Sequence, residues 1–261
     1  MSLKGKIAII TGGGRGLGRE IAIALSEAGV RVAAASRKRE ELEKTVSIIA
    51  DRGGQAMAVK ADVSDRGDVM NLIRAVEIKF GPADILVNNA GVTGPVAPLK
   101  DVKAEEFDYC MEVNFKSALT LSQAVIPGMA RKRYGKIINV TSGLAEFVMP
   151  RLGAYSISKA ALNHMTRVLA RELEDFGIKV YGLDPGTVDT QMQETLRGMD
   201  IKTLGPEAYR IFWTLKQSGQ LRPPSEVARL AVFLASEEAD NLSGEIGTES
   251  HFMKWGYRIA A

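Results

Sequence analysis

The sequence has little of several features that define large classes of proteins. Among its 261 residues there is one cysteine, Cys110, so an internal disulfide is excluded and a reducing compartment is expected. The two histidines, His164 and His251, lie far apart without a cluster of cysteines or carboxylates, which argues against a metal site. No hydrophobic run approaches the roughly 20 residues of a membrane span.

An excess of charge of one sign is also missing. The 34 lysines and arginines nearly balance the 31 aspartates and glutamates, and the net charge of +3 does not indicate nucleic acid or an anionic membrane as a partner. The opening stretch MSLKGKIAIITGGG has no signal-peptide cleavage site, because its apolar run leads directly into glycines. We therefore expect a soluble, cytoplasmic protein.

Short apolar segments alternate with longer amphipathic ones along the chain. Six segments have the composition of strands: 6–11, 31–36, 55–60, 84–88, 136–142 and 179–183. They are apolar almost throughout, which is typical of a parallel sheet covered on both faces. Helical patterns lie near residues 17–28, 39–51, 66–79, 103–132 and 155–175. Such repeated units predict an α/β fold, a Rossmann-type doubly wound parallel sheet flanked by helices, in a single domain over residues 1–261.

Two further features refine this prediction. Glycines lie where the helices should end, at Gly29, Gly53, Gly81, Gly135 and Gly177. From about 191 to 224 the alternation breaks down, and we expect an insertion that folds as a pair of helices over the edge of the sheet. Because ligands of open α/β sheets bind beyond the carboxyl ends of the strands, this insertion is a candidate substrate loop that closes as a lid. A fixed, packed helical hairpin is the alternative, and the sequence does not decide between the two.

The first predicted strand runs into TGGGRGLG, residues 11–18, and then into a helix. The spacing is T-G-x-x-x-G-x-G rather than G-x-G-x-x-G, but these glycines equally let the backbone approach a pyrophosphate at a helix N-terminus. A tight turn alone would also explain them, although the strand before and the helix after favour dinucleotide binding. The candidate binding residues of this loop are Gly12, Gly14, Arg15, Gly16, Leu17 and Gly18.

The end of the second predicted strand bears on which dinucleotide is bound. NAD sites usually have an acidic residue about 20 positions after the loop, which holds the ribose 2′-hydroxyl. Here this place is occupied by Ser36, Arg37 and Lys38. A carboxylate would repel a 2′-phosphate, whereas Arg37 and the loop residue Arg15 can bind one. The alternative is a solvated helix start, but basic residues suit a helix N-terminus poorly. The sequence therefore favours NADP.

Several motifs together resemble those of the short-chain dehydrogenase/reductase family, over nearly the whole chain. They are TGGGRGLG at 11–18, ADV at 61–63, NNAG at 88–91, EVNF with Asn114, NVTS with Ser142, YSISK at 155–159 and PGTVDT at 185–190. The resemblance implies a catalytic tetrad of Asn114, Ser142, Tyr155 and Lys159. It also implies further cofactor contacts from Asp62, Val63, Asn89, Ala90, Gly91, Tyr155, Lys159, Pro185, Gly186, Val188 and Thr190.

Tyr155 and Lys159 are four residues apart in an otherwise apolar helix, so their side chains share one face. A phenol with a pKa near 10 is a poor proton donor at neutral pH, and a neighbouring cation should lower that pKa. On the resemblance, Ser142 would polarise a carbonyl oxygen and Asn114 would hold a water next to Lys159. The implied reaction is hydride transfer between NADP(H) and a ketone or alcohol, with Tyr155 moving the proton. The alternative is an ordinary i,i+4 pair.

Other functions stay open at this point. A 3-ketoacyl-carrier-protein reductase is one alternative, because Arg133 fits a carrier-binding arginine of such enzymes, although the second such position is Phe176. A non-catalytic dinucleotide-binding sensor is another, which the complete tetrad disfavours. Tyr181 and Asp184 in VYGLDPG depart from the small or neutral residues usual in the family, which leaves the shape of the substrate pocket open.

The helical patterns at 103–132 and 155–175 carry apolar residues around most of their circumference. One stripe of a helix suffices to cover a sheet, so the remaining apolar surface needs a second partner. We therefore expect a homo-oligomer, and on the family resemblance a homotetramer, that acts on a small-molecule carbonyl or alcohol substrate.

Overall fold

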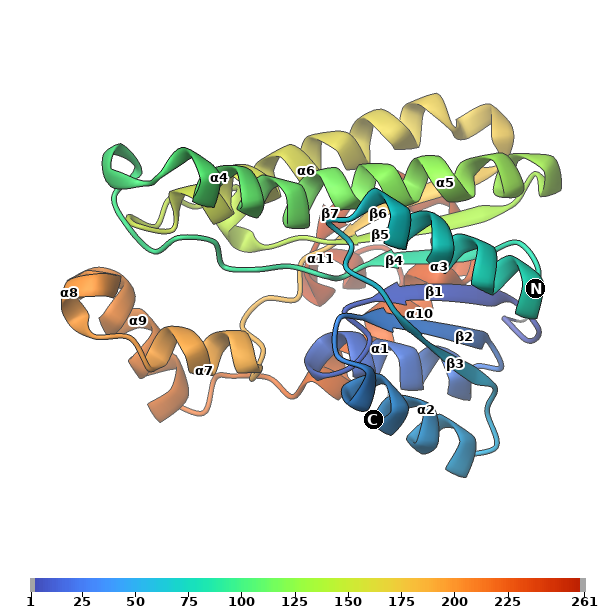
Figure 1. Ribbon diagram of the computed structural model, residues 1–261, viewed down its shortest axis with the longest axis horizontal. Coiled ribbons are helices and arrows are strands. Elements are labelled where there is room, and N and C mark those ends of the chain that lie inside the picture. Colours follow the sequence, from blue (N-terminus) through green and yellow to red (C-terminus); the bar gives the residue numbers. More distant parts are fainter. Residues whose placement is uncertain (1–2, 259–261) are drawn as a thin grey trace.

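The computed structural model describes residues 3–258, which form a seven-stranded parallel sheet with the strand order β3-β2-β1-β4-β5-β6-β7 (Figure 1). The strands are β1 (Ile7–Thr11), β2 (Arg31–Ser36), β3 (Ala56–Lys60), β4 (Ile85–Asn88), β5 (Gly135–Val140), β6 (Ile178–Leu183) and β7 (Ile246–Gly247). The order reverses between the central strands β1 and β4, which confirms the doubly wound α/β fold.

Helices cover both faces of this sheet (Figure 1). One face carries α3 (Arg66–Lys79), α4 (Ala104–Met111), α5 (Ser117–Lys132) and α6 (Gly153–Glu172). The other carries α1 (Gly16–Glu27), α2 (Arg39–Asp51) and α10 (Pro224–Ala235). Beside the sheet lie α7 (Gln191–Arg197), α8 (Ile201–Leu204) and α9 (Pro206–Gln217), and α11 (Glu249–Met253) follows β7. Short 3-10 turns occur at Leu99–Asp101, Gly143–Ala145, Glu174–Phe176 and Glu237–Leu242.

Strand β1 shows why the central strands are apolar throughout. Successive side chains of a strand point to opposite faces of the sheet. Ala8 and Ile10 accordingly join the core beneath α1 and α10, whereas Ile7 and Ile9 join the core beneath α3, α5 and α6. Because both faces are covered, no position of β1 is left for a solvated polar side chain.

The predicted helix near residues 103–132 is interrupted. Between α4 and α5 the chain forms a π-helical turn at Glu112–Lys116, which contains Asn114. Turns of this kind occur often at functional sites, because the extra residue displaces side chains from the regular helical positions. The hydrophobic periodicity on either side continues and gave no sign of this insertion.

One of the five predicted helix-ending glycines has a different role. Gly29, Gly53, Gly81 and Gly177 have φ angles between 71° and 102°. In contrast, the C-cap residue after α5 is Arg133, in a left-handed conformation with φ 49°, and Gly135 is the first residue of β5. Gly135 is required there for space, since a Cβ atom would lie 2.5 Å from the sulfur of Met129.

The segment from 191 to 224 contains three helices, α7 to α9, rather than the predicted pair. They have a small hydrophobic core of their own, built from Leu196, Leu204, Ala208 and Phe212, which packs on Leu152. The segment is therefore fastened to the loop before α6. The sequence provided no prediction for α10 or for the short edge strand β7.

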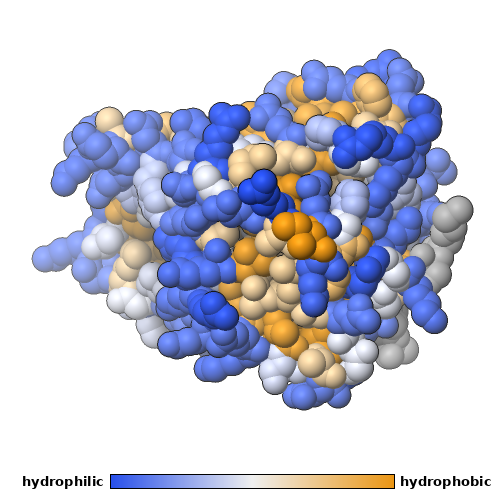
Figure 2. All heavy atoms as spheres, turned by 45° about the vertical axis from the view of Figure 1, so that its right-hand side comes forward, coloured by the Kyte–Doolittle hydropathy of each residue, from blue (hydrophilic) through white to orange (hydrophobic). Residues whose placement is uncertain are grey.

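The surface carries hydrophilic and hydrophobic areas side by side. On the face seen in Figure 2, hydrophobic residues gather in a central strip that hydrophilic residues surround. Within the described part of the chain, no helix is both long enough and apolar enough to span a membrane.

Candidate active site

A cavity of about 510 Å³ lies where the loops after the six strands β1 to β6 meet, at the carboxyl ends of these strands. All residues predicted from the sequence as binding or catalytic line it, except Asn114: Gly12, Gly14, Arg15, Gly16, Leu17, Gly18, Ser36, Arg37, Lys38, Asp62, Val63, Asn89, Ala90, Gly91, Ser142, Tyr155, Lys159, Pro185, Gly186, Val188 and Thr190. The fold thus collects in one place side chains that are up to 178 positions apart, from Gly12 to Thr190.

The glycine loop has the geometry that a dinucleotide pyrophosphate requires. Gly12 and Gly16 adopt φ angles of 64° and 53°, and a Cβ atom on Gly18 would lie 2.3 Å from the carbonyl oxygen of Gly12. Arg15, the N-cap residue of α1, makes no side-chain hydrogen bond to the amides of the first turn. The amides of the first turn therefore have no capping side chain, as an anion site at a helix N-terminus needs.

The NNAG motif is fastened to the glycine loop. The Asn89 side chain donates to the carbonyl oxygen of Thr11 at 2.8 Å. The Thr11 hydroxyl in turn accepts the backbone N–H groups of Asn89 and Ala90, each at 3.0 Å. Because these bonds join the ends of β1 and β4, they hold both walls of the cavity in register.

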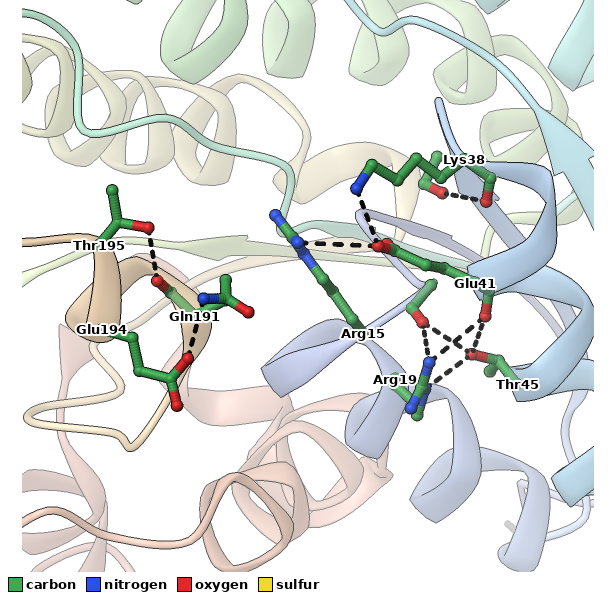
Figure 3. A network of polar contacts seen from close by, with 10 residues as sticks. Arg15, Arg19, Lys38, Glu41, Thr45, Gln191, Glu194 and Thr195 are labelled. Carbon is green, nitrogen blue, oxygen red and sulfur yellow. Dashed lines mark hydrogen bonds and ion pairs between the residues drawn. The ribbon is translucent and has the colours of Figure 1, made fainter. Parts of the chain in front are cut away.

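Charged side chains gather at the end of the cavity next to β2 (Figure 3). Arg15 and Lys38 both point toward the carboxylate of Glu41, which lies 3.6 Å from Arg15 Nη1 and 3.3 Å from Lys38 Nζ. We call this part of the cavity the adenosine end, because the sequence analysis expects the adenosine part of a dinucleotide there.

Arg37 also belongs to the adenosine end, but its side chain has other partners. Its Nη1 donates to the Tyr109 hydroxyl at 2.9 Å, so the guanidinium spans from β2 to α4. Burial alone would raise the pKa of Asp62, but hydrogen bonds from Ser64 and the charge of Arg37 outweigh it and the pKa is lowered. Asp62 therefore stays ionised near Arg37.

Tyr155, Lys159 and Ser142 lie together at the opposite end, which we call the reacting end. Lys159 is 4% exposed, and its ammonium donates to the carbonyl oxygen of Val140 at 2.8 Å. It lies 5.8 Å from the centre of the Tyr155 ring. Burial lowers the pKa of Lys159 to about 8. Both side chains come from consecutive turns of α6, as the i,i+4 spacing predicts.

The expected lowering of the Tyr155 pKa is wrong for this structure. Burial raises the pKa of Tyr155 to about 12, against the opposing effect of a hydrogen bond with Ser142, and the negative charge of Asp184 adds to the rise. Two facts explain the difference: the phenol is desolvated, and the Lys159 ammonium is engaged with the end of β5. Neither fact follows from helical spacing.

Asn114 lies behind the cavity rather than in its wall. Its side-chain oxygen accepts the backbone N–H of Val92 at 2.8 Å, and its side-chain nitrogen donates to the carbonyl oxygen of Val92 at 2.9 Å and to the Ser158 hydroxyl at 2.9 Å. The residue therefore joins the π turn to α6 and to the chain after β4. This contact set supports the position of Val92 and Ser158.

The two residues that depart from the family pattern lie on either side of the end of β6. Tyr181 is fully buried, and its hydroxyl donates to the carbonyl oxygen of Ala239 at 2.9 Å. Asp184 accepts the backbone N–H of Gly186 at 2.9 Å, and burial raises its pKa. Tyr181 is thus part of the core, while Asp184 braces the loop that enters the cavity.

The cavity also contains residues that the sequence analysis did not single out. Among these is Glu41, whereas Gln193 and Phe212 belong to the insertion at 191–224 that was expected as a substrate loop. Glu41 occurs in the first turn of α2, where an acidic residue is ordinary. No local signal distinguishes it, because its role depends on side chains that approach from the glycine loop.

A doubly wound sheet, a glycine loop at a helix N-terminus and a Tyr–Lys pair in the same cavity together define a dinucleotide-dependent α/β oxidoreductase. The family model described as short chain dehydrogenase matches residues 6–200. The chain therefore belongs to the short-chain dehydrogenase family, whose members are oxidoreductases that bind NAD or NADP.

Known proteins are similar to this chain over almost its full length. A short-chain type dehydrogenase/reductase from Picea abies is 36% identical, and the match covers 94% of this chain and 90% of the relative. A 3-oxoacyl-acyl-carrier-protein reductase from Vibrio cholerae is 34% identical, with 94% and 96% covered. The solved structure of an NAD+-bound xylitol dehydrogenase is 25% identical with a TM-score of 0.85, and 95% and 98% of the two chains are covered.

Proposed function

We propose that this protein is an NADP(H)-dependent oxidoreductase that interconverts a ketone and an alcohol, with Tyr155 as proton donor and acceptor. One observation carries the proposal: a single cavity holds Tyr155, Ser142 and Lys159 at one end and the basic side chains of Arg15, Arg37 and Lys38 at the other. In such a cavity the dinucleotide supplies or accepts a hydride when bound, while the protein provides position, charge and a proton path.

The reacting end supports a proton transfer at the substrate oxygen. In the reduction direction, Tyr155 donates its phenolic proton to the carbonyl oxygen, while Ser142 hydrogen-bonds that oxygen and orients it. A raised pKa keeps the phenol protonated, as a donor requires. The ammonium of Lys159, 5.8 Å from the centre of the Tyr155 ring, is the cation toward which the negative charge develops as the proton leaves. The oxidation of an alcohol runs through the same groups in reverse.

The adenosine end supports NADP as the cofactor. Strand β2 ends in Ser36, which is uncharged and does not repel a phosphate, and Arg37 and Lys38 follow it. These cations and Arg15 favour a 2′-phosphate, which is a dianion and accepts charge-assisted hydrogen bonds. The xylitol dehydrogenase with the similar fold binds NAD+, so the preference rests on side chains rather than on the fold.

A second candidate, a 3-ketoacyl-carrier-protein reductase, is favoured by the Vibrio cholerae relative. The surface near α5 supports it less. Arg133 donates to the carbonyl oxygen of Asp175 in its own chain at 3.0 Å, and its neighbour Phe176 is 48% exposed where such reductases have a second arginine. We propose the general carbonyl reductase first for this reason.

The proposal extends to assembly and location. Helices α4 and α6 expose Tyr109, Ile157 and Val168 by 40 to 42%, which is apolar surface that a second copy of the chain would cover. A homotetramer in the cytoplasm is the arrangement we propose, and light scattering at micromolar concentration tests its oligomeric part. A monomer would refute it.

Titration of the protein with NADPH and with NADH, followed by cofactor fluorescence, tests the choice of dinucleotide. We expect NADPH to bind more tightly than NADH. Arg37→Asp should weaken NADPH binding by well over tenfold, since it replaces a cation by a negative charge that repels the 2′-phosphate. Arg39→Asp is the matched control, because Arg39 is exposed and pairs with Glu43 instead. Tighter binding of NADH by the unaltered protein would refute the preference.

A screen of NADPH oxidation with ketones, sugars and acyl thioesters tests the substrate class. Turnover of simple ketones or sugars supports the first proposal, and turnover of acyl thioesters alone supports the carrier-protein reductase. Binding of NADPH without turnover of any of them would indicate a dinucleotide sensor.

A further inference from the structure

The carboxylate of Glu41 is placed among the cations that we propose to bind the cofactor phosphate (Figure 3). Its distances of 3.6 Å to Arg15 and 3.3 Å to Lys38 make it their shared counterion. The Glu41 side chain is 24% exposed, whereas those of Arg15 and Lys38 are 53% and 68% exposed. The carboxylate is therefore the innermost of the three charges and the least screened by solvent.

The position of Glu41 is fixed by the glycine loop. A Cβ atom on Gly14 would lie 3.0 Å from the Cβ of Glu41, so the loop backbone rests against the first turn of α2. Arg19 joins the same two segments, since its guanidinium donates to the carbonyl oxygens of Gly14 and Glu41. Thr45 adds a hydrogen bond to Gly13 at 3.0 Å. The base of the Glu41 side chain is therefore held against the glycine loop.

This placement affects the two dinucleotides in opposite ways. The ribose 2′-hydroxyl of NAD can donate a hydrogen bond to the Glu41 carboxylate. The 2′-phosphate of NADP instead brings a second negative charge close to that carboxylate. Arg15 and Lys38 would have to exchange part of their interaction with Glu41 for the phosphate. Arg37, which is turned toward Tyr109 and Asp62, is the remaining cation of this end.

We propose that Glu41 is a specificity-determining residue, which weakens the discrimination of this site against NAD by opposing the 2′-phosphate and accepting the ribose hydroxyl. This inference rests on the proposed cofactor site and deepens it: the basic residues set the preference for NADP, and Glu41 limits its size. The enzyme accordingly uses NADH as a second, weaker cofactor rather than excluding it.

The test replaces Glu41 by its uncharged isostere. For Glu41→Gln we expect the dissociation constant for NADPH to fall and that for NADH to stay or rise, so that the ratio of the NADH to the NADPH constant increases by about three- to tenfold. Both constants are measured by fluorescence titration at low ionic strength. Glu43→Gln is the matched control, because it removes the same charge from the exposed side of the same helix. Glu41→Asp keeps the charge and should leave the ratio closer to that of the unaltered protein.

The inference is overturned if Glu41→Gln leaves the ratio within twofold of the unaltered protein, lowers it, or changes it no more than Glu43→Gln does. This outcome is distinct from failure of the proposed cofactor. If the unaltered protein prefers NADH but Glu41→Gln raises the ratio, the NADP preference fails and the role of Glu41 stands. If the unaltered protein prefers NADPH but Glu41→Gln leaves the ratio unchanged, the NADP preference stands and the role of Glu41 fails.

Discussion

The charged side chains at the two ends of the cavity differ in their exposure to solvent. At the reacting end Lys159 is 4% exposed, and burial lowers its pKa to about 8 while burial raises that of Tyr155 to about 12. At the adenosine end the Lys38 side chain is 68% exposed and is paired with Glu41. Buried charges interact strongly but are costly to desolvate, whereas exposed pairs are screened and contribute little to stability.

This contrast separates chemistry from recognition. Groups that must exchange a proton are desolvated, so their pKa values respond to every neighbouring charge. Groups that must select a phosphate stay near solvent, where they can attract an anion from a distance. Changes at the reacting end should therefore alter rate and stability, and changes at the adenosine end should alter affinity alone.

The largest effect is expected from removing the proton donor. Tyr155→Phe keeps the ring in place and deletes the hydroxyl, so turnover with any accepted ketone should fall by about 10²- to 10⁴-fold. Steady-state kinetics measures the fall, and fluorescence titration should show that NADPH binding changes little. Tyr134→Phe, at a tyrosine whose ring packs under Lys6, is the control. Less than a tenfold loss would mean that Tyr155 does not carry the proton.

A pH profile should report the buried ammonium. Lys159 is charged below its pKa of about 8 and loses this charge as the pH rises. We expect kcat/KM for ketone reduction to decline by about tenfold for each pH unit above this value. The dissociation constant for NADPH, which depends mainly on exposed cations, should change less over the same range. A flat rate profile up to pH 10 would contradict the role of the Lys159 charge.

Removal of the buried ammonium should also stabilise the fold. The folded pKa of Lys159, about 8, is lower than the ordinary value of 10.5, so between these pH values the unfolded chain binds more protons. The destabilising effect is therefore full below about pH 8 and fades as the pH approaches 10.5. Lys159→Met should raise the free energy of unfolding at pH 7 by about 1–3 kcal/mol, less the lost bond to Val140.

Denaturant unfolding at pH 7 and pH 10 tests this prediction, with a smaller gain expected at the higher pH. Lys38→Met at the adenosine end is the matched control and should change stability by less than about 0.5 kcal/mol. If Lys159→Met is less stable than the unaltered protein at both pH values, the lost hydrogen bond to Val140 outweighs the relief of desolvation.

The smallest effect concerns ionic strength. Because the cations of the adenosine end are more than half exposed at Arg15 and Lys38, NADPH binding should weaken by a few-fold between about 0.05 and 0.5 M salt. The maximal rate at saturating cofactor should hardly change, since the ammonium of Lys159 at the reacting end is buried. An equal response of both quantities would remove the distinction between the two ends.

The sequence by itself determined the fold class. Apolar strands, glycines after β1 and the order of the motifs depend on residues that are neighbours in the chain, so their patterns can be recognised before folding. This holds for β1, whose Ala8 and Ile10 face one core and Ile7 and Ile9 the other. The cavity-lining residues between Asp62 and Thr190 were instead named on the family resemblance, because no local pattern shows that they meet.

The tertiary structure decided what depends on contacts between distant segments. The π turn at Asn114, the use of Arg133 rather than a glycine to end α5, and the three helices after Thr190 all reflect packing that no local pattern encodes. The same is true of the pKa of Tyr155, which helical spacing suggested would be lowered and which burial raises. Glu41 became a candidate only when the fold placed its carboxylate beside Arg15. Spacing along a helix predicts which side chains are neighbours, but desolvation and counterions depend on everything that surrounds them.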